Sequence, residues 1–226
     1  MNSCHKIALL AVVLGITLSA SVQAGIINLS PGLLRYISAK WGSEGAQRAL
    51  DLQLMEQQQA ALLRATANNS KIERNWLSAD NTFWNHIPYF SDKEHWGVDD
   101  YWATPIETLA SNGGDCEDYS IGKYLTLKDL GVPIQKLRIT YVRALNRNES
   151  HMVLAYYPEP DAEPLILDNL TGEILPASQR TDLEPIYSFN DDDLWLEGGG
   201  SSKSGKSSQI RLWRELLERM AKERKL

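Results

Sequence analysis

Apolar residues in the first part of the chain recur at the spacing of a helix. From residue 43 to residue 67 they fall near one side of a helix, which predicts a long helix there. The polar run 68–70 ends it, and Ser70 followed three residues later by Glu73 has the form of a capping box. A second helix is therefore predicted over 71–81.

The centre of the chain contains an aromatic segment and two further helices. Residues 82–101 are rich in aromatic side chains but have no regular period, so an ordered loop with short helical turns is expected. Thr104 before Pro105 is typical of a helix start and predicts a short helix to residue 110. After a tight turn over 111–114, an apolar stripe predicts a helix over 115–130.

From residue 136 the pattern changes to alternating apolar and polar positions. It predicts strands over 136–144, 151–157, 165–170 and 186–189, separated by prolines and polar turns. Such short connections are typical of antiparallel hairpins. Helices followed by an antiparallel sheet indicate the α+β class.

The first residues have the pattern of a secretory signal peptide over 1–24. Lys6 precedes an apolar run over 7–18, and small residues follow up to Ala24. An apolar run of about twelve residues is shorter than the roughly 20 needed to cross a membrane. We therefore expect cleavage after Ala24, a periplasmic protein and no stable membrane insertion, with a buried N-terminal helix as the alternative.

The last residues also differ from the centre. A glycine- and serine-rich run over 198–208 predicts a flexible linker after a domain over 25–197. Residues 209–226 have apolar side chains along one side and an excess of Arg and Lys, which predicts a basic amphipathic helix. This helix could dock on the domain, or it could bind a partner or a membrane surface.

Composition and charge limit the classes of function. The chain has 226 residues, of which 43% are hydrophobic, enough for one sizeable core. Its formal net charge is −6, and its centre lacks a basic patch interleaved with aromatic residues. Nucleic acid binding needs clustered Lys and Arg and is therefore not expected.

Removal of the signal peptide would remove Cys4 and leave Cys116 as the only cysteine. In an oxidising compartment a lone cysteine is either a buried passenger or a nucleophile. Cys116 follows Gly113 and Gly114 at the start of a predicted helix, where unpaired N–H groups and the helix dipole lower a thiol pKa. Its own N–H could also stabilise an oxyanion. This position favours a nucleophile.

A thiol nucleophile needs a base, and the base needs an orienting group. His86 and His95 lie in the aromatic segment, whereas His151 begins an apolar strand. Asp168 ends the next apolar run, so on adjacent antiparallel strands it could accept a hydrogen bond from His151. Each of these two residues alone is more often structural. Together with Cys116 they supply nucleophile, base and orienting group.

Four short motifs resemble the transglutaminase-like cysteine protease superfamily. More narrowly, the chain is similar to the bacterial periplasmic LapG-type subgroup, whose members release a large biofilm adhesin. The similarity covers roughly residues 76–189. The motifs are Gly-Gly-Asp-Cys-Glu-Asp-Tyr at 113–119, Leu-Gly-Val-Pro at 130–133, His-Met-Val-Leu at 151–154 and Leu-Asp-Asn at 167–169.

The resemblance implies a papain/transglutaminase-like fold, with an N-terminal helical lobe packed on an antiparallel sheet. It implies a catalytic triad of Cys116, His151 and Asp168, and calcium dependence with Asp115 and Glu117 as ligands. It also implies cleavage in the N-terminal region of a large surface adhesin, at a di-alanine-type site. An inner-membrane receptor that senses cyclic di-GMP would control the enzyme and so biofilm attachment.

Local charge gives a separate reason to expect calcium. Asp115, Glu117 and Asp118 surround a sulfur that must ionise, and a cation with oxygen ligands would offset their repulsion. Asp99 and Asp100 could complete the ligand set. Alternatively, Asp115 caps the helix and the other two acids only favour its dipole.

Two other functions use the same residues. A transglutaminase-type acyltransferase has the same triad but transfers the acyl group to an amine instead of water. A non-catalytic, calcium-dependent binding module would keep the fold and lose cleavage. The presence of all three triad residue types argues against the binding module.

Overall fold

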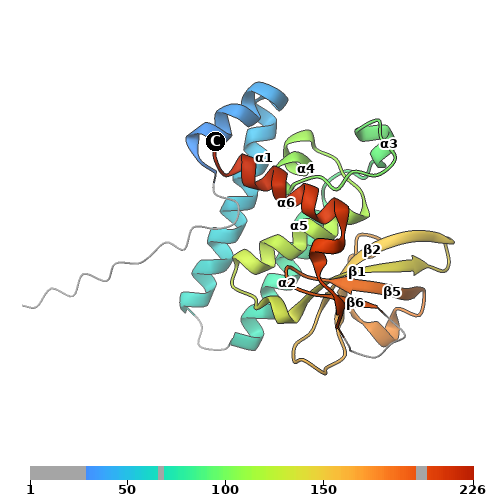
Figure 1. Ribbon diagram of the computed structural model, residues 1–226. Coiled ribbons are helices and arrows are strands. Elements are labelled where there is room, and N and C mark those ends of the chain that lie inside the picture. Colours follow the sequence, from blue (N-terminus) through green and yellow to red (C-terminus); the bar gives the residue numbers. More distant parts are fainter. Residues whose placement is uncertain (1–28, 66–68, 197–202) are drawn as a thin grey trace, which may run out of the picture.

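The computed structural model describes residues 29–65, 69–196 and 203–226, and the predicted signal peptide lies outside these ranges. The described chain folds into helices on one side and a seven-stranded antiparallel sheet on the other (Figure 1). This confirms the α+β class. Among the described helices, none combines the length and the apolar character needed to cross a membrane.

The elements have the following bounds. The helices of the described chain are α1 (Pro31–Ala65), α2 (Asn69–Asn85), α3 (Asp92–His95), α4 (Pro105–Ser111), α5 (Cys116–Asp129) and α6 (Arg211–Glu223), with 3-10 turns at Ile134–Lys136, Ala177–Gln179 and Ser207–Gln209. The strands are β1 (Leu137–Ala144), β2 (Glu149–Tyr156), β3 (Leu165–Leu167), β4 (Leu175–Pro176), β5 (Leu183–Phe189), β6 (Leu194–Leu196) and β7 (Lys203–Gly205), in the spatial order β4-β3-β2-β1-β5-β6-β7.

The first helix is longer than predicted because it contains two segments joined at Gly42. The predicted helix over 43–67 corresponds to the second segment, and residues 31–41 form the first. Gly42 has a φ of 80°, a conformation that residues with a Cβ rarely adopt, so glycine permits the kink.

The second helix also extends beyond its predicted range. The prediction of a capping box is wrong, because Ser70 lies inside α2. Glu73 forms an ion pair with Lys136 instead, with 2.9 Å between Glu73 Oε2 and Lys136 Nζ. At its other end α2 continues to Asn85, since Trp84 is completely buried against the neighbouring helix α5. Burial of aromatic side chains thus extends a helix that periodicity alone ends too early.

Helix α5 lies between α2 and the sheet (Figure 1). A Cβ at Gly122 would lie 2.6 Å from ring atoms of Trp84, so the two helices approach closely there. The shorter helix α4 begins as predicted, because the Thr104 hydroxyl accepts a hydrogen bond from the N–H of Glu107 at 3.1 Å. These helices hold α5 against the central strands β2 and β1 of the sheet.

The sheet contains strands that the pattern did not predict. The strand predicted over 165–170 ends at Leu167, so Asp168 lies just beyond β3. The strand predicted over 186–189 begins earlier, as β5, and β4, β6 and β7 are short additions. Strands of two or three residues have too few alternating positions to give a signal.

The C-terminal region is part of the same body. The linker prediction is wrong for the described residues 203–208, because β7 pairs with β6 and Lys206 forms an ion pair with Asp193 (3.0 Å). Helix α6 buries Trp213, Leu216 and Met220 in the main core. The helix therefore docks on the domain, and the membrane-surface alternative is not needed to explain its apolar side (Figure 1).

Candidate active site

Cys116 is the first residue of α5, with Asp115 at the N-cap position. The two preceding glycines are required by close approach. A Cβ at Gly114 would lie 2.7 Å from Asp118 Oδ2, and a Cβ at Gly113 would lie 2.6 Å from the His95 ring. Cys116 is half-buried and lines a cavity of about 630 Å³. The structure thus places the thiol at a helix start and open to a ligand.

The charge around the thiol opposes ionisation. Burial, the charge of Glu117 and its hydrogen bond (Sγ to Oε2, 2.8 Å), and the charge of Asp115 raise the pKa of Cys116 well above its usual value. The N–H of Met152 lowers it by a smaller amount. The predicted lowering of the thiol pKa by the helix start is therefore wrong for the metal-free chain, since burial and the adjacent carboxylates outweigh the effect of the helix start.

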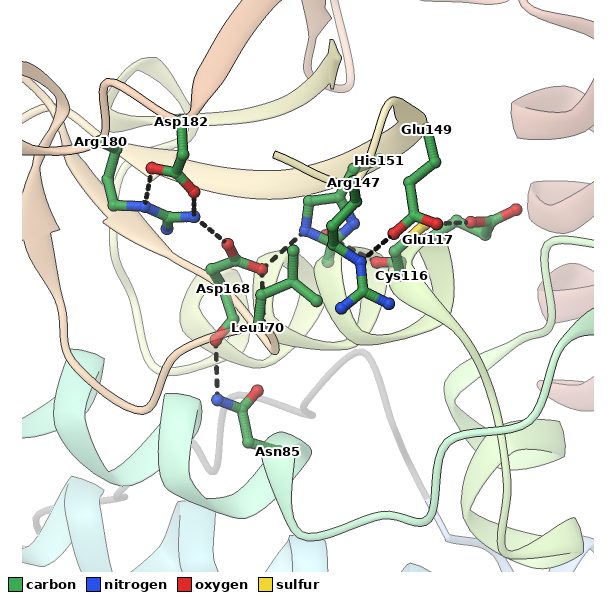
Figure 2. Close-up of polar contacts among 11 residues, drawn as sticks. Asn85, Cys116, Glu117, Arg147, Glu149, His151, Asp168, Leu170, Arg180 and Asp182 are labelled. Atoms are coloured by element: carbon green, nitrogen blue, oxygen red, sulfur yellow. Dashed lines mark hydrogen bonds and ion pairs between the residues drawn. The ribbon is translucent and has the colours of Figure 1, made fainter. Parts of the chain in front are cut away.

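His151 and Asp168 form the pair that their positions predicted. His151 Nε2 lies 2.7 Å from Asp168 Oδ1, and both side chains are buried. His151 lines the same cavity as Cys116, and its ring lies between Asp168 and Cys116 in Figure 2. An ionised carboxylate can only accept, so the neutral imidazole carries its proton on Nε2 and has its lone pair on Nδ1. The ring thus has its basic nitrogen free of Asp168.

Asp168 has further partners that the sequence did not predict. Its Oδ2 accepts from Arg180 Nη2 at 2.7 Å, and its Oδ1 accepts from the N–H of Leu170 at 3.0 Å. Its backbone carbonyl accepts from Asn85 Nδ2 at 2.8 Å (Figure 2). Burial alone would raise the pKa of Asp168, but His151, the Leu170 N–H and Arg180 lower it to about 2. The carboxylate is therefore ionised at neutral pH.

The other two histidines of the described chain have separate partners. His86 Nδ1 lies 2.6 Å from the carbonyl oxygen of Thr82, on the surface. His95 Nε2 lies 2.8 Å from Ser111 Oγ, and its ring stacks on Phe90. Neither lines the cavity at Cys116. Of these histidines, only His151 is in a position to serve as the base.

The predicted calcium ligands converge beside the thiol, together with an acid that the sequence analysis missed. Carboxylate oxygens of Asp92, Asp115 and Asp118 lie within 4.8 Å of one another, and so do those of Asp92, Asp100 and Glu117. Asp92 is buried at the start of α3, in the segment predicted as a loop. Nothing in its local sequence distinguishes it from an ordinary helix-starting acid.

This acidic cluster fits a hard cation with oxygen ligands. Asp115 Oδ1 is buried and has no hydrogen-bond partner in the described chain. Burial and the charge of Glu117 raise the pKa of Asp115 to about 8, and burial and the charge of Asp115 raise that of Asp92 to about 6. Crowded, buried carboxylates of this kind are stabilised by a bound divalent cation.

Two acids in this region have other roles. Asp118 Oδ1 accepts from the N–H of Ala103 at 2.8 Å, and its Oδ2 accepts from the N–H of Asp115 at 3.3 Å. These bonds connect the helix start to the preceding loop, a role that the capping alternative had not given to Asp118, which it expected only to favour the helix dipole. Asp99 is almost fully exposed and pairs with Lys93 (3.3 Å), and it belongs to none of the carboxylate groups.

The C-terminal segment also contributes to the cavity. Ile210, Arg211 and Leu212, at the start of α6, line it together with residues of the sheet. Farther along α6, Arg219 donates to the carbonyl oxygen of Trp102 and lies over the Tyr101 ring, 4.5 Å from its centroid. The loop beside the acidic cluster is therefore held by the C-terminal helix α6, for which docking on the domain was one of the predicted alternatives.

Comparisons with known proteins agree in sequence and in fold. The profile of a family described as "Bacterial transglutaminase-like cysteine proteinase BTLCP" matches residues 53–195. EGTA-treated LapG of Legionella pneumophila is 39% identical, with a TM-score of 0.70, over 84% of this chain and 96% of that chain. Calcium-bound LapG of the same organism is 37% identical, with a TM-score of 0.67, over 83% and 97%. No curated protein matches the chain.

Proposed function

Since the chain belongs to the bacterial transglutaminase-like cysteine proteinase family, we propose that it is a calcium-dependent endopeptidase with Cys116 as its nucleophile. Its helices and sheet form the transglutaminase-like fold that the sequence resemblance implied. One observation carries the proposal: His151, which is paired with the buried Asp168, lines the same cavity as the half-buried thiol. That arrangement brings together nucleophile, base and orienting group.

The proposed reaction follows from the positions of these side chains. His151 Nδ1 takes the proton of the Cys116 thiol, and the sulfur attacks the scissile carbonyl carbon. The N–H of Cys116, at the start of α5, stabilises the oxyanion. The imidazolium then returns its proton to the leaving amine as the C–N bond breaks and a thioester forms. Water, deprotonated by His151, attacks the thioester and releases the acid and the thiol.

Asp168 keeps the ring in place through both steps. Its carboxylate accepts from Nε2 whether the imidazole is neutral or charged, and it stabilises the imidazolium. Because its pKa lies at about 2, Asp168 remains ionised over the pH range in which a cysteine protease works. The ring can therefore neither flip nor exchange its tautomer without the loss of a buried hydrogen bond.

We assign the acidic cluster beside Cys116 to calcium. Asp115, Glu117, Asp92 and Asp100 would supply oxygen ligands, with Asp118 holding the loop that carries them. A bound calcium ion would supply positive charge that offsets the carboxylates around the sulfur. Free of its hydrogen bond to the thiol, Glu117 would no longer hold the Cys116 proton. The similarity to calcium-bound LapG of Legionella pneumophila supports this assignment.

The substrate and the control of the enzyme follow from the LapG-type resemblance. We propose that the protein is exported to the periplasm after removal of residues 1–24 and cleaves the N-terminal region of a large surface adhesin there. An inner-membrane receptor that responds to cyclic di-GMP would sequester it and so control biofilm attachment. Sequence identity of 39% to a LapG over 84% of the chain supports this substrate class.

A cleavage assay tests the proposal. Recombinant N-terminal fragments of candidate adhesins are incubated with the native protein or with Cys116→Ala, with calcium or with excess EGTA, and the products are measured by mass spectrometry. We expect cleavage only by the native protein with calcium. Full activity in EGTA would refute the calcium assignment, and cleavage by Cys116→Ala would refute the nucleophile.

The same assay separates the two alternative functions. If an added primary amine is incorporated at the new C-terminus in preference to water, the enzyme is an acyltransferase. If Cys116→Ala binds the adhesin with native affinity and no condition gives cleavage by the native protein, the fold serves as a binding module.

A further inference from the structure

We propose that Arg180 is a positioning residue for this triad, one that fixes the orientation of the Asp168 carboxylate and is itself held by Asp182. The inference rests on the proposed function, because it assigns Arg180 a part in the same catalytic site. Arg180 belongs to none of the motifs that carry the family resemblance, and it lies outside the element that bears the nucleophile.

The contacts form a continuous chain in which Asp168 and Arg180 are buried and Asp182 is partly exposed (Figure 2). Arg180 Nη2 lies 2.7 Å from Asp168 Oδ2, and the side chains are only 6% and 0% exposed. Asp182 accepts from both Nε and Nη2 of Arg180, each at 2.9 Å. Asp182 therefore holds the Nε–Nη2 edge of the planar guanidinium in a bidentate arrangement that a lysine cannot reproduce, and Asp168 accepts from Nη2 as well.

The two oxygens of Asp168 have different partners. Oδ1 accepts from His151 Nε2 and from the N–H of Leu170, whereas Oδ2 accepts from Arg180. The terminal torsion of an aspartate is broad and nearly two-fold, so a carboxylate held at one oxygen can rotate. With donors on both oxygens this rotation breaks buried hydrogen bonds. Arg180 thus determines which direction Oδ1 offers to the imidazole.

Backbone hydrogen bonds also hold Arg180 in place. Its N–H donates to the carbonyl oxygen of Ala177 at 3.0 Å, and its carbonyl oxygen accepts from the N–H of Leu183 at 3.1 Å. Leu183 is the first residue of β5, which pairs with β1, and β1 pairs with the strand that bears His151. The guanidinium and the imidazole are therefore fixed relative to each other by one sheet.

Four charged groups act on Asp168 from the elements around it. They are His151 on β2, Arg180 and Asp182 before β5, and Lys123 on α5, whose buried ammonium is attracted by Asp168. Arg180 is the only one of these cations that has a hydrogen bond to Asp168 and stays charged at every working pH. Loss of Arg180 should therefore raise the pKa of Asp168 and move the acidic limb of the pH–rate profile to higher pH.

A buried ion pair can also have a purely structural role. The test therefore needs a measurement that a change in stability alone would not alter. The variants are Arg180→Met, Arg180→Lys and Asp182→Asn. The matched control is Arg143→Met, which removes an exposed arginine of β1 that pairs with Glu184 of β5. For each variant, kcat, KM and the pH profile of adhesin-fragment cleavage are measured in calcium, together with thermal unfolding.

A second measurement does not depend on catalysis. The tautomer of His151 is read from ¹⁵N chemical shifts of labelled histidine in the Cys116→Ala background, with and without each substitution. In the unsubstituted background we expect one species protonated on Nε2. If the Cys116→Ala protein still cleaves the fragment, the proposed function fails, but the NMR result still decides the role of Arg180.

We expect Arg180→Met to lower kcat by about 10²-fold with little change in KM, as small displacements of a catalytic group do. Arg180→Lys should keep a higher kcat than Arg180→Met, and the kcat of Asp182→Asn should lie between those of the native protein and Arg180→Met. In the NMR measurement, both Arg180→Met and Asp182→Asn should broaden the His151 signal or give a mixture of tautomers. A folded Arg180→Met with the kcat, pH profile and His151 signal of Arg143→Met would overturn the inference. If Arg180→Met does not fold, Asp182→Asn decides by the same criteria.

Discussion

Removal of calcium should make the folded chain less stable as the pH rises from 6 to 8. The reason is Asp115, which is only 8% exposed and has one carboxylate oxygen without a partner in the described chain. Burial and the charge and hydrogen bond of Glu117 raise its pKa from 3.8 to about 8. The metal-free fold therefore binds this proton more tightly than the unfolded chain does.

The sign and the size of the effect follow from linkage. For an acid whose pKa is raised by folding, stability is intact below the unfolded pKa of 3.8 and is lost as the pH rises to about 8. The total loss is on the order of 5 kcal/mol, of which about 2 kcal/mol falls between pH 6 and pH 8. For a chain of this size, 2 kcal/mol corresponds to about 4–8 °C in Tm.

Thermal unfolding followed by circular dichroism provides the assay. The native protein, Asp115→Asn and a control, Asp161→Asn at an exposed acid, are measured at pH 6 and pH 8, in EGTA and in calcium. We expect the native protein and the control to lose stability towards pH 8 in EGTA, and Asp115→Asn to lose much less. Calcium at 100 times its Kd should add about 2.7 kcal/mol and remove most of the pH dependence of the native protein. Equal slopes for Asp115→Asn and the native protein in EGTA would refute this reasoning.

Three further predictions test the ligand set and the packing around it. Asp92→Asn should weaken calcium binding in isothermal titration calorimetry, whereas Asp99→Asn should not, because Asp99 is exposed and lies outside the clusters of carboxylates. Equal calcium affinities for the two variants would exclude Asp92 as a ligand. Trp213→Ala should lower the free energy of unfolding in urea by about 3–5 kcal/mol, since its side chain is fully buried, and the half-exposed Leu217→Ala by much less; similar values for both would mean that α6 does not dock. Gly122→Ala should cost about 1–3 kcal/mol, because the added methyl would meet the ring of Trp84, and a native-like urea midpoint would contradict the close approach of α2 and α5.

The sequence determined the features that depend on near neighbours. Thr104 and Pro105 start α4 because a cap is made by residues three positions apart. The sequence also predicted the glycine turn before Cys116 and the helix that begins there. Alternating apolar positions indicated the long strands β1 and β2, and the order of Cys116, His151 and Asp168 along the chain indicated their pairing.

Which distant charges meet depends on long-range packing. Asp92 and Arg180 lie in segments without a distinctive local pattern, and packing alone brings one to the acids beside Cys116 and the other to Asp168. The direction of the thiol pKa was decided in the same way. A helix start favours the thiolate, but burial among carboxylates opposes it more strongly, and burial is a property of the folded chain.

The C-terminal helix shows the same division. Its apolar side was visible in the sequence, but the surface that covers it was not, because amphipathicity gives a direction without a partner. In the fold, Trp213 fills the core between α5 and the sheet, and the first turn of α6 lines the cavity at Cys116. Local sequence thus determined most of the elements and the triad candidates, whereas long-range burial and charge determined how the site is completed.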